Sequence, residues 1–204
     1  MDKIDLKKDL QSLYNPSAKV VSVVEVPSLN YLMIDGAGDP NTSPRYQSAL
    51  ETLYAVSYTV KFKLKKVNGV DYTVMPLEGL WWTDDPSRFN LQEKDLWKWT
   101  AMILQPDFVT SEQIHAACTE VERKKGVSLA EVRFESYCEG LAVQIMHIGP
   151  YSAEGPTIAR LHTYISENGY ELNGKHHEIY LSDPRRNPPE KLKTVIRQPV
   201  RRKQ

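Results

Sequence analysis

The sequence predicts an α+β fold in which two similar units form a curved, mostly antiparallel sheet with packing helices and a central cleft. Three observations predict it: runs rich in β-branched residues, helix-spaced segments that each begin at a proline, and one order of elements that occurs twice. Each predicted unit reads strand, strand, helix, strand, strand. In each half a late strand carries a carboxylate beside aromatic rings, Glu78 in the first and Glu178 in the second.

The first unit begins with a predicted hairpin. Residues 20–26 and 31–34 are β-rich, and Pro27 and Ser28 interrupt them. A helix should follow, because Ser43 can cap it and Pro44 suits its first position. The apolar stripe of this helix is Tyr46, Leu50, Leu53, Tyr54 and Tyr58 at helical spacing, before a turn at Asn68 and Gly69.

Two strands, residues 72–82 and 97–104, should complete the first unit. Thr110 and Gln113 have the spacing of a capping box, and Gly126 offers a stop. Residues 110–126 therefore predict an amphipathic connecting helix.

The second unit repeats the pattern. Residues 131–137 and 141–148 predict a hairpin that turns near Glu139 and Gly140, and a helix should start at Pro156. Strands are expected at 176–182 and 192–199. No Gly/Ser linker separates the halves, so we expect residues 1–204 to form one domain, with unit one over about 18–105, the connecting helix over about 110–126 and unit two over about 130–200.

The composition limits the partners. The 26 basic and 26 acidic residues balance, so no global field favours nucleic acid or an anionic membrane. The basic residues near the end, Arg197 and Arg201–Lys203, are expected to be solvated. The two cysteines are too few for a disulfide scaffold, and no apolar run reaches the roughly 18 residues of a membrane helix. We expect a cytoplasmic protein without membrane contact.

Alternation along the strands sorts the candidate residues into faces. Glu78 shares a face with Trp82, and Glu178 shares one with His176 and Tyr180. Each carboxylate could be a solvated residue of an outer face. If the two instead face a cleft, burial would raise their pKa values, and they could hold a cation or act as a general base toward water.

The aromatic residues leave core and ligand-contact roles open. Tyr58 lies on the helical stripe, Trp81 and Trp82 must point to opposite faces of their strand, and Trp97 and Trp99 share a face. The histidines show no metal-binding spacing, because His176 and His177 project to opposite faces. We expect no metal and no cofactor.

His147-Ile-Gly-Pro-Tyr151, followed by a helix and by Glu178 on a strand, resembles the GyrI-like small-molecule-binding family over roughly residues 18–200. Residues 72–81 and 177–197 are similar to the stand-alone subfamily that includes cyclopropanoid cyclopropyl hydrolases. The resemblance implies that Glu178 is the central acid of the pocket, with Tyr151 and Tyr180 near it. Glu78, Trp82 and Tyr58 would contribute from the first unit, and the ligand-binding set is completed by Trp99 and His147.

Two functions stay open at this point. The subfamily implies an enzyme that opens the strained ring of planar DNA-alkylating compounds by adding water inside an aromatic cage. The alternative is a non-catalytic protein that sequesters planar hydrophobic or cationic drugs, with Glu178 supplying the charge. Nothing in this neutral sequence indicates a protein partner such as gyrase, and without a helix-turn-helix segment we do not expect DNA binding.

Overall fold

The computed structural model describes residues 3–85, 93–126 and 128–204, and it confirms an α+β fold with a mainly antiparallel sheet. Within these residues, hydrogen-bonded neighbours give the strand order β4-β1-β3-β2-β6-β7-β5, with a further pairing of β4 and β7. The strands are β1 (Ser22–Ala37), β2 (Leu77–Trp82), β3 (Lys98–Leu104), β4 (Arg133–Ile148), β5 (Tyr170–Leu172), β6 (His176–Tyr180) and β7 (Lys193–Arg202).

The chain divides into two compact units that are interleaved along the sequence. Unit 1 contains residues 1–6, 29–77 and 81–137, and unit 2 contains residues 7–28, 78–80 and 138–204. Strands β1, β2 and β4 each contribute residues to both units. Glu78 therefore belongs to unit 2 together with Glu178. The expectation that the two units form one domain stays a prediction.

The two predicted hairpins are wrong, because each is a single long strand. Pro27 and Ser28 lie within β1 and are exposed, and a strand tolerates a proline best at an exposed position. Gly140 lies within β4 with a φ of 70°, a backbone conformation that glycine adopts without strain. Both local signals interrupt the strand pattern without reversing the chain.

The predicted helices are confirmed together with their ends. Helix α3 (Pro44–Asn68) is capped by Ser43, whose hydroxyl accepts a hydrogen bond from the N–H of Tyr46, and Gly69 ends it in a left-handed conformation. Helix α4 (Ser111–Lys125) has the complete capping box of Thr110 and Gln113. Helix α5 (Gly155–Glu167) begins with a proline in its first turn.

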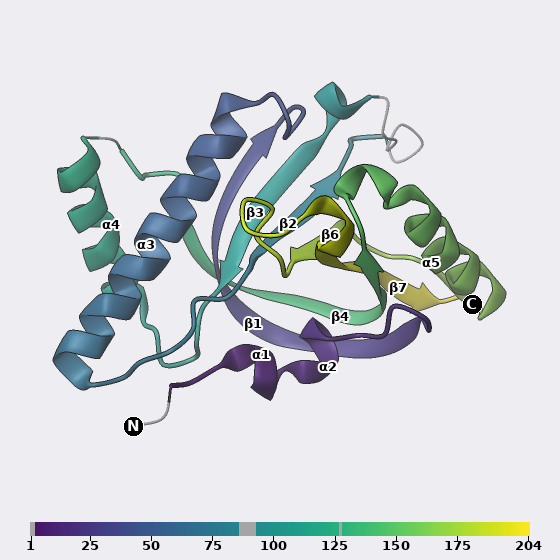
Figure 1. Ribbon diagram of the computed structural model, residues 1–204, viewed down its shortest axis with the longest axis horizontal. Helices are drawn as coiled ribbons and strands as arrows, with labels where there is room; N and C mark the ends of the chain where they lie inside the picture. Colours follow the sequence, from purple (N-terminus) through teal and green to yellow (C-terminus); the bar gives the residue numbers. More distant parts are fainter. Residues whose placement is uncertain (1–2, 86–92, 127) are drawn as a thin grey trace. The chain divides into compact units, whose positions relative to one another are not determined.

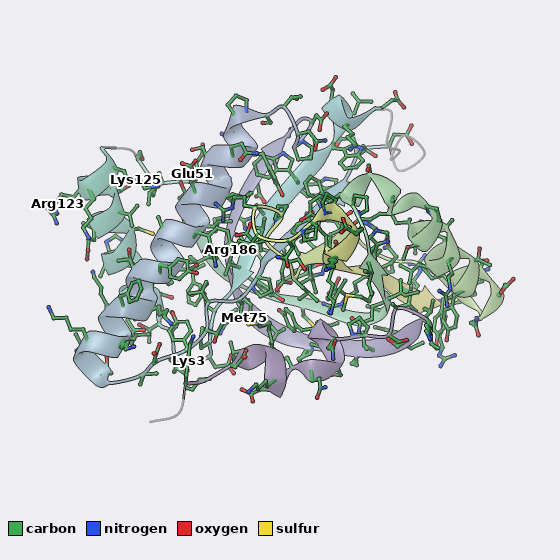
Figure 2. All side chains as sticks on the ribbon, viewed as in Figure 1. Lys3, Glu51, Met75, Arg123, Lys125 and Arg186 are labelled. Atoms are coloured by element: carbon green, nitrogen blue, oxygen red, sulfur yellow. The ribbon has the colours of Figure 1, made fainter. Side chains whose placement is uncertain are left out.

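Unit 1 is built around the packing of α3. Its buried residues Leu53, Val56 and Val60 recur every three or four positions, and the helix packs against β3 and α4 (Figure 1). Figure 2 shows Arg123 on the side of α4 that points away from α3, and both Arg123 and Lys125 are exposed.

Unit 2 has its own apolar core under α5. Leu161 and Ile165 of this helix cluster with Val143 and Ile145 of β4 and with Ile196 of β7. Two short helices that the sequence analysis did not predict, α1 (Leu6–Asp9) and α2 (Gln11–Tyr14), precede β1. Tyr14 is 3% exposed, so α2 is anchored although it is only one turn long.

Candidate functional site

Strand β6 carries polar side chains on both faces. Because side chains alternate along a strand, His176, Glu178 and Tyr180 lie on one face, and His177 lies on the other. Glu178 pairs with Ile196 of β7, so their side chains lie on the same face of the sheet. Ile196 packs with Leu161 and Ile165, so this is the face that α5 covers. We name His176, Glu178, Tyr180 and the neighbouring Tyr151 the Glu178 cluster.

Both carboxylate oxygens of Glu178 accept hydrogen bonds. The hydroxyl of Tyr180 donates to Oε2 at 2.7 Å, and Nε2 of His176 lies 3.1 Å from Oε1. The ring of Tyr151 meets that of Tyr180 edge-on, with centroids 5.5 Å apart. The Glu178 side chain is 13% exposed and Tyr151 is 37% exposed, so the cluster is partly open to solvent.

The surroundings of Glu178 favour its ionised form. Burial alone would raise the pKa of this carboxyl, but the hydrogen bond and charge of His176 and the hydrogen bond from Tyr180 outweigh burial and lower it. A raised pKa was predicted for this carboxyl if it faced a cleft, and the prediction is wrong because two donors accompany the burial. Glu178 is therefore a carboxylate at neutral pH.

His147 lies in the same layer as the cluster. It pairs with Thr194 of β7, and Thr194 pairs with Tyr180 of β6, so these three residues form a row across the sheet. Its Nε2 lies 3.3 Å from the carbonyl oxygen of Pro150, and its Nδ1 lies 2.9 Å from the hydroxyl of Thr157. These bonds fix the corner that leads to Tyr151.

Gly149 allows that corner to form. Its φ is 144°, and a Cβ atom there would lie 3.1 Å from Nε2 of His147. The His147-Ile-Gly-Pro-Tyr151 segment is thus a turn that is held by hydrogen bonds and places Tyr151 next to Tyr180 of β6.

The other face of β6 holds a buried charged network. Nε2 of His177 lies 3.0 Å from Oε2 of Glu78, and its Nδ1 lies 2.9 Å from Oε1 of Glu139. Arg197 of β7 donates to Oε2 of Glu139 at 3.1 Å, and the Tyr14 hydroxyl donates to Oε1 of Glu78 at 2.5 Å. Glu78 and His177 are 0% exposed.

The charges in this network stabilise one another. Burial would lower the pKa of His177, but Glu139 and Glu78 raise it to about 9. Burial would likewise raise the pKa of Glu139, but His177 and Arg197 lower it to about 2. His177 is therefore an imidazolium held between two carboxylates, and the network is neutralised within itself.

Glu78 and Glu178 do not face each other. Glu78 bonds to His177, and His177 projects from the opposite face of β6 to Glu178. The expectation of two carboxylates facing one cleft is wrong for this reason. Glu178 is partly accessible, whereas Glu78 is sealed in the interior of unit 2.

The remaining predicted ligand contacts lie in unit 1. Tyr58 is 45% exposed on α3, with its ring stacked between those of Tyr54 and Phe62 at 6.3 and 6.1 Å. Trp82 ends β2 and is half-buried, while Trp81 is buried against Tyr46, so the two indoles face opposite sides as predicted.

Trp99 is a core residue. It is 0% exposed and meets Tyr46 edge-on, with centroids 5.0 Å apart. Gly36 leaves room for the indole, because a Cβ there would lie 2.1 Å from the ring. Of the two roles that the sequence left open for Trp99, the position supports core packing.

Sequence reasoning missed most of the network around His177. Glu139 was assigned to a turn, and Arg197 was expected to be solvated but is 1% exposed in the middle of β7. The one available signal was a lone arginine among apolar residues of a predicted strand. In the described ranges, no group of three or more His, Cys, Asp or Glu side chains is placed to hold a metal ion. No helix in these ranges is long and apolar enough to cross a membrane.

Comparison with protein-family models identifies the family of this chain. The model of the GyrI-like small molecule binding domain matches residues 19–201. The chain belongs to the GyrI-like family. Both β6 and the corner before α5, which carry the Glu178 cluster, lie inside the matched range.

Several solved structures are similar to this chain. An uncharacterized conserved protein from Listeria innocua is 42% identical over 98% of this chain and 100% of its own, with a TM-score of 0.91. A hydrolase from the same organism is also 42% identical over the same shares, with a TM-score of 0.85. The C-terminal domain of EcmrR is 15% identical over 90% of this chain and 98% of its own, with a TM-score of 0.54, and shows the fold alone. Comparison with the curated proteins found no match.

Proposed function

We propose that this GyrI-like protein is a hydrolase that adds water to the cyclopropane ring of planar, electrophilic dienones, with Glu178 as the general base. The observation that carries the proposal is the Glu178 cluster: an ionised, partly accessible carboxylate held at both oxygens beside two tyrosine rings. The solved relatives that are 40 and 42% identical and named hydrolases support it.

The reaction needs little machinery because the substrate is strained. Glu178 would accept a proton from a water molecule as the water oxygen attacks the outer carbon of the three-membered ring. The ring bond to the dienone breaks, and its electron pair makes the dienone a phenolate. The single proton of the Tyr180 hydroxyl is already donated to Glu178, so the hydroxyl of Tyr151 would donate a hydrogen bond to this oxygen. Glu178 then returns its proton, so the net change is the addition of one water molecule.

The aromatic rings would hold the flat substrate. Contact with a tyrosine ring stabilises a planar ligand by about 0.5–1.5 kcal/mol beyond the burial of apolar area. We propose this role for Tyr180, which donates a hydrogen bond to Glu178, and for Tyr151, whose ring contacts that of Tyr180. Contact of the ligand with Tyr58 and Trp82 stays a prediction.

The test is hydrolysis of a simple spirocyclopropyl dienone, which becomes a hydroxyethyl phenol when it gains water. We expect the wild type to form this product by mass spectrometry, and Glu178→Gln to lower turnover by about 10²–10⁴-fold because the base is lost. Affinity for the neutral substrate should change little. Glu171→Gln, which removes a surface carboxylate, is the matched control. Full turnover by Glu178→Gln would exclude Glu178 as the base.

A second function is favoured by the charge of Glu178. A carboxylate that is ionised beside aromatic rings can hold a flat cation by ion pairing and cation–π contact without any reaction. If the protein only sequesters such compounds, no hydrated product forms with the dienone. Glu178→Gln should then weaken binding of the planar cation ethidium, measured by fluorescence, more than binding of a neutral aromatic of similar size.

A further inference from the structure

His176 is the buried histidine that shares a face with Glu178. Its side chain is 5% exposed, and its Nε2 lies 3.1 Å from Oε1 of Glu178. Because an ionised carboxylate has no proton to donate, Nε2 must carry the proton in this bond. The second oxygen is held by Tyr180, so the carboxylate is restrained from both sides.

We propose that His176 is a positioning residue, which keeps the Glu178 carboxylate ionised and oriented toward the attacking water. The inference rests on the proposed function, in which Glu178 is the base. A carboxylate has about four lone pairs that can accept hydrogen bonds, so two donors still leave lone pairs that can accept a hydrogen bond from a water molecule. Without His176, one oxygen would lose its donor in a mostly buried place, where the neutral acid is favoured.

The charged groups around the carboxylate support this role. His176 and Tyr180 contact it from its own strand, and His177 acts on it from the opposite face. His162 of α5 lies close enough to His176 to be affected by it: burial, and then the charge of His176, lower the pKa of His162. Of these groups, only His176 and Tyr180 donate a hydrogen bond to Glu178.

Three variants of the full-length protein separate positioning from packing. His176→Phe keeps a ring of similar size and removes the donor. His176→Gln keeps an N–H donor at nearly the position of Nε2. His162→Phe removes the exposed neighbouring imidazole, which makes no hydrogen bond to Glu178, and is the matched control. If His176→Phe does not fold, His176→Asn takes its place, because its amide is too short to reach Oε1.

Two measurements decide the proposal. Carbon NMR of the labelled Glu178 carboxyl reports its titration without a substrate, and the pH dependence of kcat/KM for the spirocyclopropyl dienone reports its catalytic consequence. We expect His176→Phe to raise the titration midpoint by about one pH unit or more and to move the acid limb of the rate profile with it. We expect kcat to fall more than KM rises. His176→Gln and His162→Phe should stay close to the wild type.

Unchanged titration and an unchanged acid limb in His176→Phe would overturn the proposal, as would a shift of equal size in His176→Gln. If the wild type does not hydrate the dienone, the proposed function fails. The NMR titration then still decides whether His176 holds Glu178 ionised.

Discussion

At the scale of single residues, two glutamates with similar sequence surroundings have opposite environments. Glu178 is partly open and held by two hydrogen-bond donors, whereas Glu78 is sealed between His177 and Tyr14. A base needs access to water, and a structural anion needs a fixed counter-charge. The geometry therefore suits Glu178 to the proposed role of base and Glu78 to a structural role.

Replacing Glu78 should affect stability first. Glu78→Gln leaves the buried imidazolium of His177 with one carboxylate in place of two, and loss of a buried ionic partner costs about 3–5 kcal/mol. We expect the free energy of unfolding in urea to fall by this order. Asp183→Asn removes ion pairs with the exposed Arg185 and Arg186 and should change the free energy of unfolding by less than about 1 kcal/mol. Equal effects of the two changes would contradict a structural role for Glu78.

At the scale of elements, the His177 network joins residues of four strands within unit 2, namely β2, β4, β6 and β7. His177 of β6 pairs with Arg197 of β7, and Arg197 pairs with Gln144 of β4, so their side chains form a row on one face. Arg197 also donates to the side chain of Gln144 and to the carbonyl oxygen of Leu13 in α2. The face of β6 behind Glu178 is thereby fixed by hydrogen bonds, which limits movement of the strand that carries the proposed base.

This network predicts how stability depends on pH. The pKa of His177 is raised from 6.5 to about 9, so its contribution is complete below pH 6.5 and is lost as the pH rises through 9. The pKa of Glu139 is lowered from 4.5 to about 2, so its contribution is complete above pH 4.5 and is lost as the pH falls toward 2. We expect the free energy of unfolding to be highest between about pH 5 and pH 6.5.

Urea unfolding at a series of pH values checks this expectation. In His177→Gln the alkaline decline between about pH 6.5 and pH 9 should flatten, since no group at this position titrates. The same decline in the variant would show that other groups cause it.

At the scale of the whole molecule, three strands belong to both compact units. Residues 78–80 of β2 are part of unit 2, although the residues on either side belong to unit 1. If one unit unfolded, the shared strands β1, β2 and β4 would be disrupted, and the other unit would lose part of its sheet. The sequence expectation of one domain, 1–204, therefore becomes the proposal that both units unfold in one cooperative step.

The tryptophans offer a direct test, because Trp81, Trp82, Trp97 and Trp99 all lie in unit 1. Tryptophan fluorescence should report unit 1, and hydrogen exchange of the α5 amides should report unit 2. We expect both probes to give one urea midpoint. Two separate midpoints would show that the units unfold independently.

The sequence by itself determined where helices α3, α4 and α5 of this protein begin and which face of β6 carries Glu178. The ends of α3 and α4 follow from the caps at Ser43 and Thr110 and from the glycine stops at Gly69 and Gly126. The face that carries Glu178 follows from the strand pattern of residues 176–182. These signals involve residues a few positions apart, so the pattern along the chain contains them. The resemblance of residues 147–151 and 177–197 to the GyrI-like family is of the same kind, and the family match confirms it.

Only the tertiary structure decided which polar side chains meet. Tyr14 and Glu78 are 64 residues apart, and Glu78 and His177 are 99 apart. It also decided that Pro27 and Gly140 lie within continuous strands, because hydrogen bonds to neighbouring strands outweigh local turn signals. The lowered pKa of Glu178 has the same origin: burial could be guessed from the sequence, but the donors that overcome it depend on how β6 is placed in the sheet.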